Sequence, residues 1–324
     1  MSSRKLLSVV CPVYNEELSI PLFYERLQTA LKRVHETYDV ELLFTNNRST
    51  DGTRDIILDL RRKDSSVSLI TLSRNFGYQA SVMAGLRHAS GDAVVVIDVD
   101  CEDPPEMIPT FVEGWESGFD IVYGARVQRS ELKAVHLMRL AFYRLNRLVA
   151  DSDIILDMAE FALISARVRD LILANESTYP FLRTETGYVG FSRKGIPYKR
   201  QHRLRGKTHY NVLGMIEFAI GGILSSSTFP LRFAAYLAPP VCLLCAVLLY
   251  LDLLQGLSKC LDLLVGLGVI YLVTFMACIS IYLARIYKNG VGRPIYIVDW
   301  DESAWTPFSR ESALDAMWTT NRSH

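Results

Sequence analysis

Residues 93–105 read AVVVIDVDCEDPP, an apolar run that stops abruptly at acidic residues. The β-branched side chains predict a buried strand, and two carboxylates, Asp98 and Asp100, follow it two positions apart. Because strand side chains alternate with a period of two, both carboxylates leave the strand end on the same side. Such a pair offers hard oxygen ligands to Mg²⁺ or Mn²⁺, and the ion can hold and neutralise a diphosphate. The alternative is an acidic turn that faces water, which is the better interpretation of an isolated Asp-x-Asp.

Strands and helices alternate around this stretch. Apolar runs predict three more strands, at residues 6–14, 40–44 and 67–72. Each run is followed by helical spacing of apolar residues, at 20–37, 56–60 and 79–88. This alternation predicts an α/β domain with a parallel, Rossmann-like sheet. Polar turns follow all four strands, and ligands of such sheets lie beyond the carboxyl ends of the strands, so the four turns are expected to form one site.

The middle of the chain continues the mixed pattern. Residues 120–122 and 188–191 predict short strands, and residues 131–149 predict a basic helix.

The composition changes near residue 232. Residues 233–251 and 263–284 contain no charged side chain, and each run is long enough to cross the ~30 Å hydrocarbon core of a bilayer. Arg232 precedes the first run, and Arg285, Lys288 and Arg293 follow the second. The positive-inside rule then places both ends of a multi-pass hairpin in the cytoplasm. The alternative is a pair of buried helices in a soluble core.

These patterns divide the chain into four parts. They are a cytoplasmic domain (1–205), amphipathic interface helices (206–232), two transmembrane helices (233–287) and a cytoplasmic C-terminal tail (288–324). We expect the tail to be poorly ordered from Asp301 onward, and we expect no signal peptide before the first strand. Lys and Arg total 35, as do Asp and Glu, so the balance of charge gives no support to nucleic-acid binding.

Five motifs stand in order along the chain. They are VYNEE at 13–17, STDGT at 49–53, SRNFG at 73–77, DVD at 98–100 with DPP at 103–105, and STFPLR at 227–232. Together they resemble the family 2 glycosyltransferases that load polyprenyl phosphates, among them bactoprenol glucosyltransferases and dolichyl-phosphate mannose synthases. The resemblance covers about residues 6–298. It implies a GT-A fold followed by interface helices and a two-helix transmembrane hairpin.

The resemblance also implies an activity. The expected enzyme is an inverting glycosyltransferase that moves a sugar from a UDP- or GDP-sugar to undecaprenyl or dolichyl phosphate. It would work at the inner or plasma membrane with Mg²⁺ or Mn²⁺, without nucleic acid, and as a homo-oligomer held by its membrane helices.

Site residues are carried over from the resemblance by position. The nucleotide pocket is expected to include Pro12, Tyr14, Glu16, Asn47 and Asp51. Asp98 and Asp100 are expected to bind the metal and the diphosphate. Asp100, Asp157 and Glu160 are expected to be catalytic. The acceptor phosphate is not assigned by the resemblance; its expected ligands are bases near the membrane, namely Arg126, Arg203 and Lys207, and nonspecific attraction to anionic lipid is the alternative for Arg203 and Lys207.

The chain departs from the family pattern at several positions. The family usually has an acidic pair where this chain has Asn46 and Asn47, Asp at the position of Glu160, and Arg at that of Ala162. An Asn carbonyl can still accept a hydrogen bond from a base, without charge assistance. These changes motivate an alternative, a catalytically weakened membrane partner or scaffold subunit of a glycan-assembly system. The intact Asp98 and Asp100 argue against that alternative.

Overall fold

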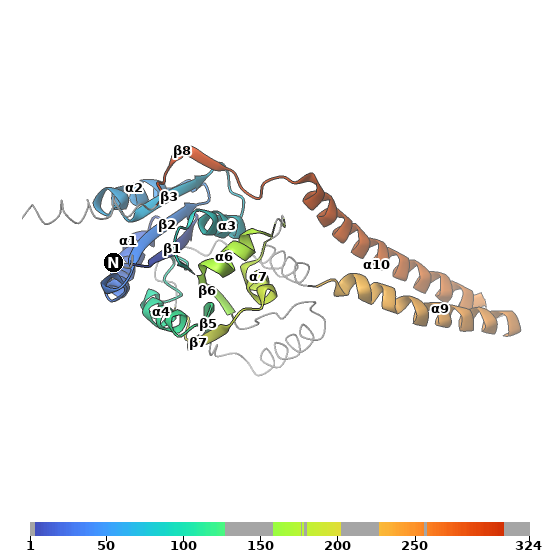
Figure 1. The fold of residues 1–324 in the computed structure, drawn as a ribbon. Coiled ribbons are helices and arrows are strands. Elements are labelled where there is room, and N and C mark those ends of the chain that lie inside the picture. The colour runs from blue at the N-terminus through green and yellow to red at the C-terminus, as the bar shows by residue number, and fades with distance from the viewer. Residues whose placement is uncertain are drawn as a thin grey trace, which may run out of the picture.

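The structure, a computed structural model, describes residues 4–126, 158–175, 177, 180–201, 227–255 and 258–307. Within these residues the chain forms an α/β domain with an eight-stranded sheet and a pair of long helices that extend away from it (Figure 1). The strands follow the order β7-β5-β6-β4-β1-β2-β3-β8.

The centre of the sheet is parallel. Its strands are β1 (Leu6–Val13), β2 (Asp39–Asn46), β3 (Val67–Leu72) and β4 (Ala93–Val96). Parallel pairing joins β1 to β2 and β4, and β2 to β3, which confirms the four strands predicted from the apolar runs. Their residues are almost all buried because helices cover both faces, and this explains the continuous apolar runs.

Beyond β4 the sheet is mixed. The strands are β5 (Ile121–Arg126), β6 (Met158–Ser165) and β7 (Arg193–Tyr198). β6 is antiparallel to both β4 and β5, while β5 and β7 are parallel. The expectation of a parallel sheet is therefore right for the first half of the domain and wrong for the second.

The strand predicted at 188–191 is also wrong. Helix α7 (Leu182–Val189) occupies this region, and the strand starts only at Arg193. Gly190 ends the helix in the left-handed conformation, with φ of 70°, which glycine adopts without steric cost. The apolar residues around this cap resembled a short strand.

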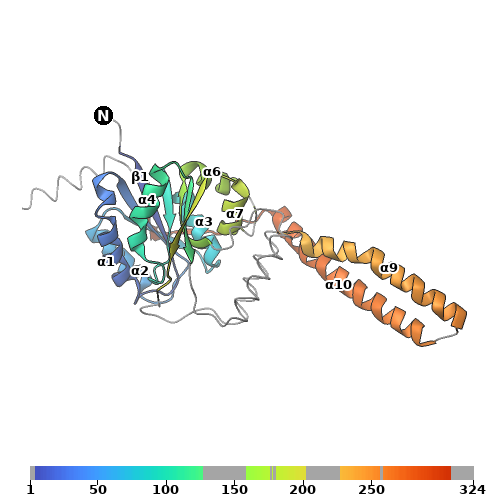
Figure 2. The same cartoon turned by 90° about the horizontal axis from the view of Figure 1, so that it is seen from below.

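Two helical layers enclose the sheet (Figure 2). One face is covered by α1 (Ile20–Leu31), α2 (Thr53–Lys63) and α4 (Ile108–Glu116), with short 3₁₀ turns η1 (Val34–Glu36) and η2 (Pro105–Met107). The other face is covered by α3 (Tyr78–His88), α6 (Ala166–Leu173) and α7. Each layer has its own buried apolar core, so the sheet edge that carries the polar turns is held between two packed layers.

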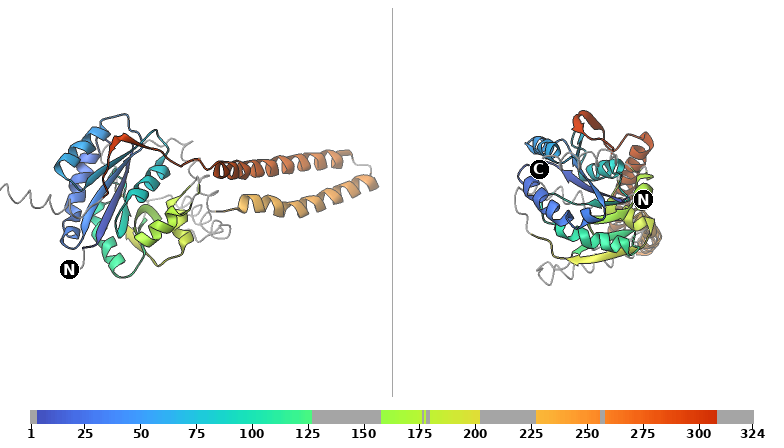
Figure 3. Two further views of the ribbon diagram at one scale, coloured as in Figure 1. Left: turned by 45° about the horizontal axis from the view of Figure 1, so that its top comes forward. Right: turned by 60° about the vertical axis from the view of Figure 1, so that its left-hand side comes forward.

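The charge-free runs form two helices that lie side by side (Figure 3). They are α9 (Phe229–Gln255) and α10 (Ser258–Val291), both longer than the predicted runs. The segments Leu231–Leu251 and Asp262–Val291 are long and apolar enough to cross a membrane, and among the described residues none buries them. Residues 229–232, expected in an interface helix, belong to α9. The rest of the predicted interface helices and the basic helix at 131–149 lie outside the described residues.

The expectation of poor order from Asp301 onward is wrong for the described residues up to 307. Strand β8 (Val298–Ala304) pairs antiparallel with β3 and completes that edge of the sheet. Trp300 and Trp305 also contact the ring of His88, with centroids 5.6 Å and 5.1 Å away. The physical reason is that an unpaired β3 edge would leave backbone donors and acceptors unsatisfied, and β8 pairs with them.

Candidate functional site

The loops after β1 and β2 are joined at the carboxyl edge of the sheet. Asn15, in the left-handed conformation with φ of 55°, donates its backbone N–H to Ser49 Oγ at 3.0 Å. Its side-chain Oδ1 accepts from the backbone N–H of Thr50 at 2.8 Å. The carboxylate of Glu17 accepts from the N–H of Gly52 at 2.7 Å. The two polar turns therefore form one unit, as the strand order predicts.

Asn47 links this unit to the loop after β3. Its Nδ2 donates to Asn75 Oδ1 at 2.9 Å, and its Oδ1 accepts from the backbone N–H of Phe76 at 2.9 Å. Neighbouring Asn46 is buried and accepts from the N–H of Ser49 at 2.9 Å. An ionised carboxylate at position 47 could not donate a hydrogen bond to Asn75. The contact with Asn75 therefore explains why this chain has Asn where the family usually has an acid.

The predicted nucleotide-pocket residues all lie at this edge. Pro12 is buried, and Tyr14 and Glu16 are partly exposed beside it. Glu16 accepts a hydrogen bond from Ser19 Oγ at 2.8 Å. Asp51 accepts from the backbone N–H of Thr53 at 3.1 Å, so it also orders the start of α2.

Four carboxylates gather where β4 ends. Asp98 lies among Asp100, Asp103 and Glu160, and its Oδ1 accepts a hydrogen bond from Tyr78 OH at 2.8 Å. Burial, and then repulsion from Asp100, Asp103 and Glu160, raises the pKa of Asp98 to about 7, although the Tyr78 bond lowers it. Accumulated negative charge of this kind favours binding of a cation.

The loop between these acids is held in a constrained conformation. Cys101 is buried in the left-handed region with φ of 60°, and the N–H of Glu102 donates to Asp100 Oδ1 at 3.0 Å. A left-handed non-glycine residue costs free energy and persists only where its surroundings fix it. Asn15 and Arg48 share this conformation, so positive φ occurs at the ends of β1, β2 and β4.

Arg126 reaches the acidic loop from the end of β5. Its guanidinium lies 3.4 Å from Asp103 Oδ2 and donates through Nε to Tyr198 OH at 3.1 Å. Tyr198 in turn donates to Asp103. Burial alone would lower the pKa of Arg126, but Asp103 and Tyr198 outweigh it and raise the pKa, so the side chain stays charged.

Glu160 lies on β6 and is almost fully buried. Its Oε1 is 3.1 Å from Arg183 Nε and 3.5 Å from Gln79 Nε2, while Oε2 has no hydrogen-bond partner among the described residues. Burial raises the pKa of Glu160, and the charge of Arg183 lowers it. A buried carboxylate oxygen without a partner at an acidic centre is available to a ligand.

The sequence missed several of these side chains. Tyr78, Gln79 and Arg183 contact the acids from α3 and α7, and Asn75 completes the amide pair. The SRNFG motif directly precedes Tyr78 and was a usable signal for α3. No sequence signal marked Arg183. Asp157, Arg203 and Lys207 lie outside the described residues.

The acidic centre fits a divalent cation only in part. In the described part of the chain, no group of three or more His, Cys, Asp and Glu side chains is arranged to hold a metal. Asp98 and Asp100 are two partly exposed carboxylates on one loop. Mg²⁺ is commonly held by one or two carboxylates together with substrate phosphates, so a cation here would need a diphosphate to complete its ligands.

Comparisons with known proteins identify the family of this chain. The family description "Glycosyl transferase family 2" matches residues 8–165. The chain is 36% identical over 309 residues to the "Uncharacterized glycosyltransferase YkcC" of Bacillus subtilis (strain 168), covering 92% of this chain and 94% of the relative. It is 33% identical over 302 residues to the "Bactoprenol glucosyl transferase" of Shigella phage SfV, covering 90% and 97%.

Among solved structures, the chain is similar to a mannosyltransferase from Pyrobaculum calidifontis in complex with GDP-Man and Mn²⁺. The identity is 18%, the TM-score is 0.42, and the match covers 89% of this chain and 88% of that one.

The parallel strands β3-β2-β1-β4, extended by antiparallel β6, make a GT-A-like α/β sheet with its polar loops at one edge. The matched residues 8–165 contain most of β1, all of β2 to β6 and the four carboxylates. Relatives above 30% identity span nearly the whole chain. The chain therefore belongs to glycosyl transferase family 2 and is a glycosyltransferase.

Proposed function

We propose that the protein transfers a sugar, with inversion at the anomeric carbon, from a UDP- or GDP-sugar to a polyprenyl phosphate at a membrane. One observation supports the assignment of a lipid as the acceptor. The match to a bactoprenol glucosyl transferase extends over 302 residues, which is too long to be confined to the α/β domain and must include the apolar hairpin. A hairpin of this kind would hold the active site beside an acceptor that is itself embedded in lipid.

The donor would lie across the carboxyl ends of β1, β2 and β4. Pro12, Tyr14, Glu16, Asn47 and Asp51 are proposed to hold the nucleoside, since they line the joined loops at that edge. Asp98 and Asp100 are proposed to hold Mg²⁺ or Mn²⁺, which would neutralise the charge of the leaving diphosphate when bound.

The acceptor supplies its own nucleophile. A phosphate monoester has a second pKa near ~6, so at neutral pH its oxygen needs no strong general base. That oxygen attacks the anomeric carbon, the bond from this carbon to the donor diphosphate breaks, and the nucleoside diphosphate leaves. The protein's main tasks are then alignment and charge compensation. Arg126, with Arg203 and Lys207, is proposed to hold the acceptor phosphate, and Asp157 and Glu160 to orient the substrates.

The remaining assignments complete the proposal. The four parts 1–205, 206–232, 233–287 and 288–324 are kept as approximate boundaries, with β8 of the last part packed on the first. The α/β domain is proposed to face the cytoplasm, because the bases beside the hairpin follow the positive-inside rule. A homo-oligomer is proposed to form through the apolar hairpin, whose side chains the described residues leave uncovered.

The test uses the purified full-length protein in lipid nanodiscs. It is incubated with undecaprenyl or dolichyl phosphate, Mn²⁺ and a panel of UDP- and GDP-sugars, and the glycolipid is detected by mass spectrometry. We expect one donor to give product, and Asp100→Asn to abolish turnover without changing recovery in the membrane fraction. Absence of product with every donor, together with no nucleotide binding, would contradict the proposal and favour a partner subunit.

A further inference from the structure

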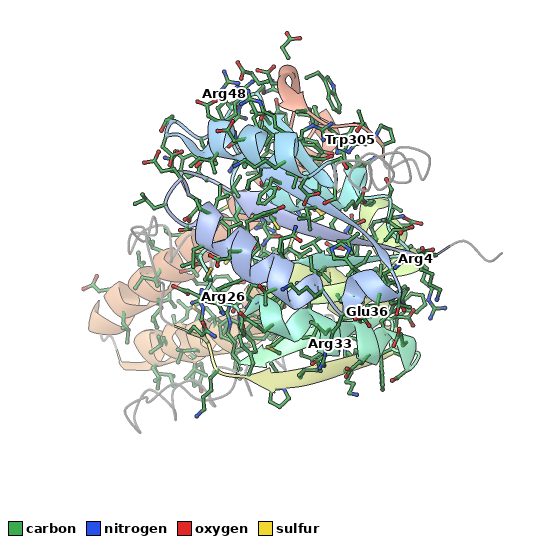
Figure 4. The ribbon with its side chains drawn as sticks, turned by 90° about the vertical axis from the view of Figure 1, so that its left-hand side faces the viewer. Arg4, Arg26, Arg33, Glu36, Arg48 and Trp305 are labelled. Atoms are coloured by element: carbon green, nitrogen blue, oxygen red, sulfur yellow. The ribbon has the colours of Figure 1, made fainter. Side chains whose placement is uncertain are left out.

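The strand that follows the hairpin contacts the donor edge of the sheet through an ion pair. Arg48 Nη1 lies 2.9 Å from Asp299 Oδ2. Arg48 directly follows the buried Asn46 and Asn47 and has φ of 61°, while Asp299 lies on β8. Figure 4 shows Arg48 at the same end of the domain as β8. The pair joins two segments that are 251 residues apart in sequence.

The same strand also holds the loop after β3. The backbone N–H of Ser73 donates to Ile297 O at 2.9 Å, and the N–H of Thr71 donates to Ser303 Oγ at 2.9 Å. The loops after β2 and β3 meet in the amide pair of Asn47 and Asn75. β8 and the residue before it therefore anchor both loops that form this part of the edge.

We infer that Arg48 and Asp299 act as a positioning pair, which fixes the loop after β2 in its donor-binding conformation. This inference rests on the proposed function and deepens it, because it assigns part of the donor affinity to the strand that returns from the hairpin. A left-handed non-glycine residue relaxes to another conformation when its anchor is lost, and Asn47 would move with it. The unbound loop would then spend less time in the binding conformation, and apparent affinity falls with that fraction.

The pair is suited to positioning rather than to global stability. Arg48 is 43% exposed and Asp299 26% exposed, and exposed ion pairs contribute little to the free energy of folding. Asp299 is held in turn, because its Oδ1 accepts from the N–H of Glu302 and its backbone O from Ser303 Oγ. Asp299 is therefore held in place and can anchor Arg48 in the loop after β2.

The chain offers a matched control. Arg54 forms a second ion pair with β8, from Nε to Glu302 Oε2 at 2.6 Å, but Arg54 lies on α2 and not in the donor loop. Arg54→Gln removes a cation of the same type from the same strand. It separates loosening of β8 in general from release of the loop after β2.

The experiment measures KM and kcat for the donor, nucleotide affinity and melting temperature for full-length Arg48→Gln, Asp299→Asn and Arg54→Gln. We expect the first two to raise KM by about two- to fivefold, the strength of an exposed ion pair, with kcat and melting temperature nearly unchanged. Arg54→Gln should leave KM as in the wild type. In the double variant Arg48→Asp with Asp299→Arg, KM should fall back toward the wild-type value, since Asp tolerates the left-handed conformation.

Three outcomes would overturn the inference. Wild-type KM in both Arg48→Gln and Asp299→Asn would show that the pair does not position the loop. An effect of Arg48→Gln alone would mean that Arg48 contacts the donor directly. An equal rise in Arg54→Gln would assign the effect to β8 as a whole. Failure of the proposed function is distinguishable, because the wild-type protein itself would then bind no nucleotide.

Discussion

Tyr78 contacts Asp98 directly, through a 2.8 Å hydrogen bond from its hydroxyl. This bond lowers the pKa of Asp98 against the effect of burial and of the neighbouring acids. Tyr78→Phe should therefore raise the Mn²⁺ concentration needed for half-maximal activity by about tenfold or more, since a hydrogen bond to a charged group contributes roughly 1.5–3 kcal/mol. The measurement is a titration of activity against Mn²⁺.

Tyr24 supplies the control for this prediction. Its hydroxyl donates to Asp64 Oδ2 at 2.7 Å, which is also a Tyr–Asp bond but joins α1 to the residue after α2. Tyr24→Phe should leave the Mn²⁺ requirement unchanged. An unchanged requirement in Tyr78→Phe would remove the role assigned to the hydroxyl.

The buried Glu160 gives a second prediction at this scale. Its partners are Arg183 and, more distantly, Gln79, and its Oε2 has none among the described residues. The positive charge of Arg183 offsets the cost of burying this carboxylate. Arg183→Gln removes that charge, so we expect a loss of roughly 1–3 kcal/mol in the free energy of unfolding. Chemical denaturation measures it. Glu160→Gln in the Arg183→Gln background should recover part of the loss, whereas additive losses would contradict the coupling.

Some of the site's residues were predictable and others were not, for a physical reason. Asp98 and Asp100 stand at the end of an apolar run, and local pattern alone places such residues at a strand end. Tyr78 and Arg183 reach the acids only because α3 and α7 pack on the sheet. That packing depends on contacts remote in sequence, which no local pattern records.

At the scale of elements, Glu41 holds the amino ends of the strands together. It is buried on β2, accepts a hydrogen bond from Ser8 on β1, and accepts from the N–H of Ser90 at 2.6 Å. Burial raises the pKa of Glu41 above its ordinary value of 4.5, and these bonds lower it in part. The folded state therefore binds this proton more tightly than the unfolded chain does.

The titration of Glu41 makes the stability of the fold depend on pH. The stability that the protonated Glu41 contributes is fully present below pH 4.5 and is lost as the pH rises through the raised pKa. Glu41→Gln does not titrate, so the difference in unfolding free energy, wild type minus variant, should fall across that range and then level off. Denaturant midpoints at a series of pH values measure it. Ser8→Ala removes a hydrogen bond that lowers the pKa of Glu41, so in that background the fall should occur at higher pH. A difference in unfolding free energy that rises with pH would contradict this prediction.

The strands themselves show what pattern can predict. β1 to β4 are buried on both faces and local in connection, so their apolar runs identify them. β7 and β8 are edge strands that contain Gly, Pro or charged residues, and each forms because a partner strand offers an open edge. Their existence is decided by tertiary pairing more than by their own residues.

At the scale of the whole molecule, the helical hairpin exposes a large apolar surface outside the α/β domain. Its side chains point outward along both helices, with Val273 and Met276 more than half exposed near the middle of α10. In water this surface would be unstable, and in a bilayer it is matched to the hydrocarbon. The helices are therefore expected to span a membrane rather than to pack in a soluble core.

Two paired substitutions test this expectation. Each Arg placed at the centre of a span costs roughly 2.5–3.5 kcal/mol of insertion free energy, so Val273→Arg with Met276→Arg should shift much of the protein out of carbonate-resistant membranes. Ile286→Arg with Tyr287→Arg adds the same charge on equally exposed side chains near the end of α10, where long bases reach the interface, and should leave membrane recovery unchanged. Equal recovery of both variants, or release of the wild-type protein by carbonate, would mean that the hairpin is covered by protein and not by lipid.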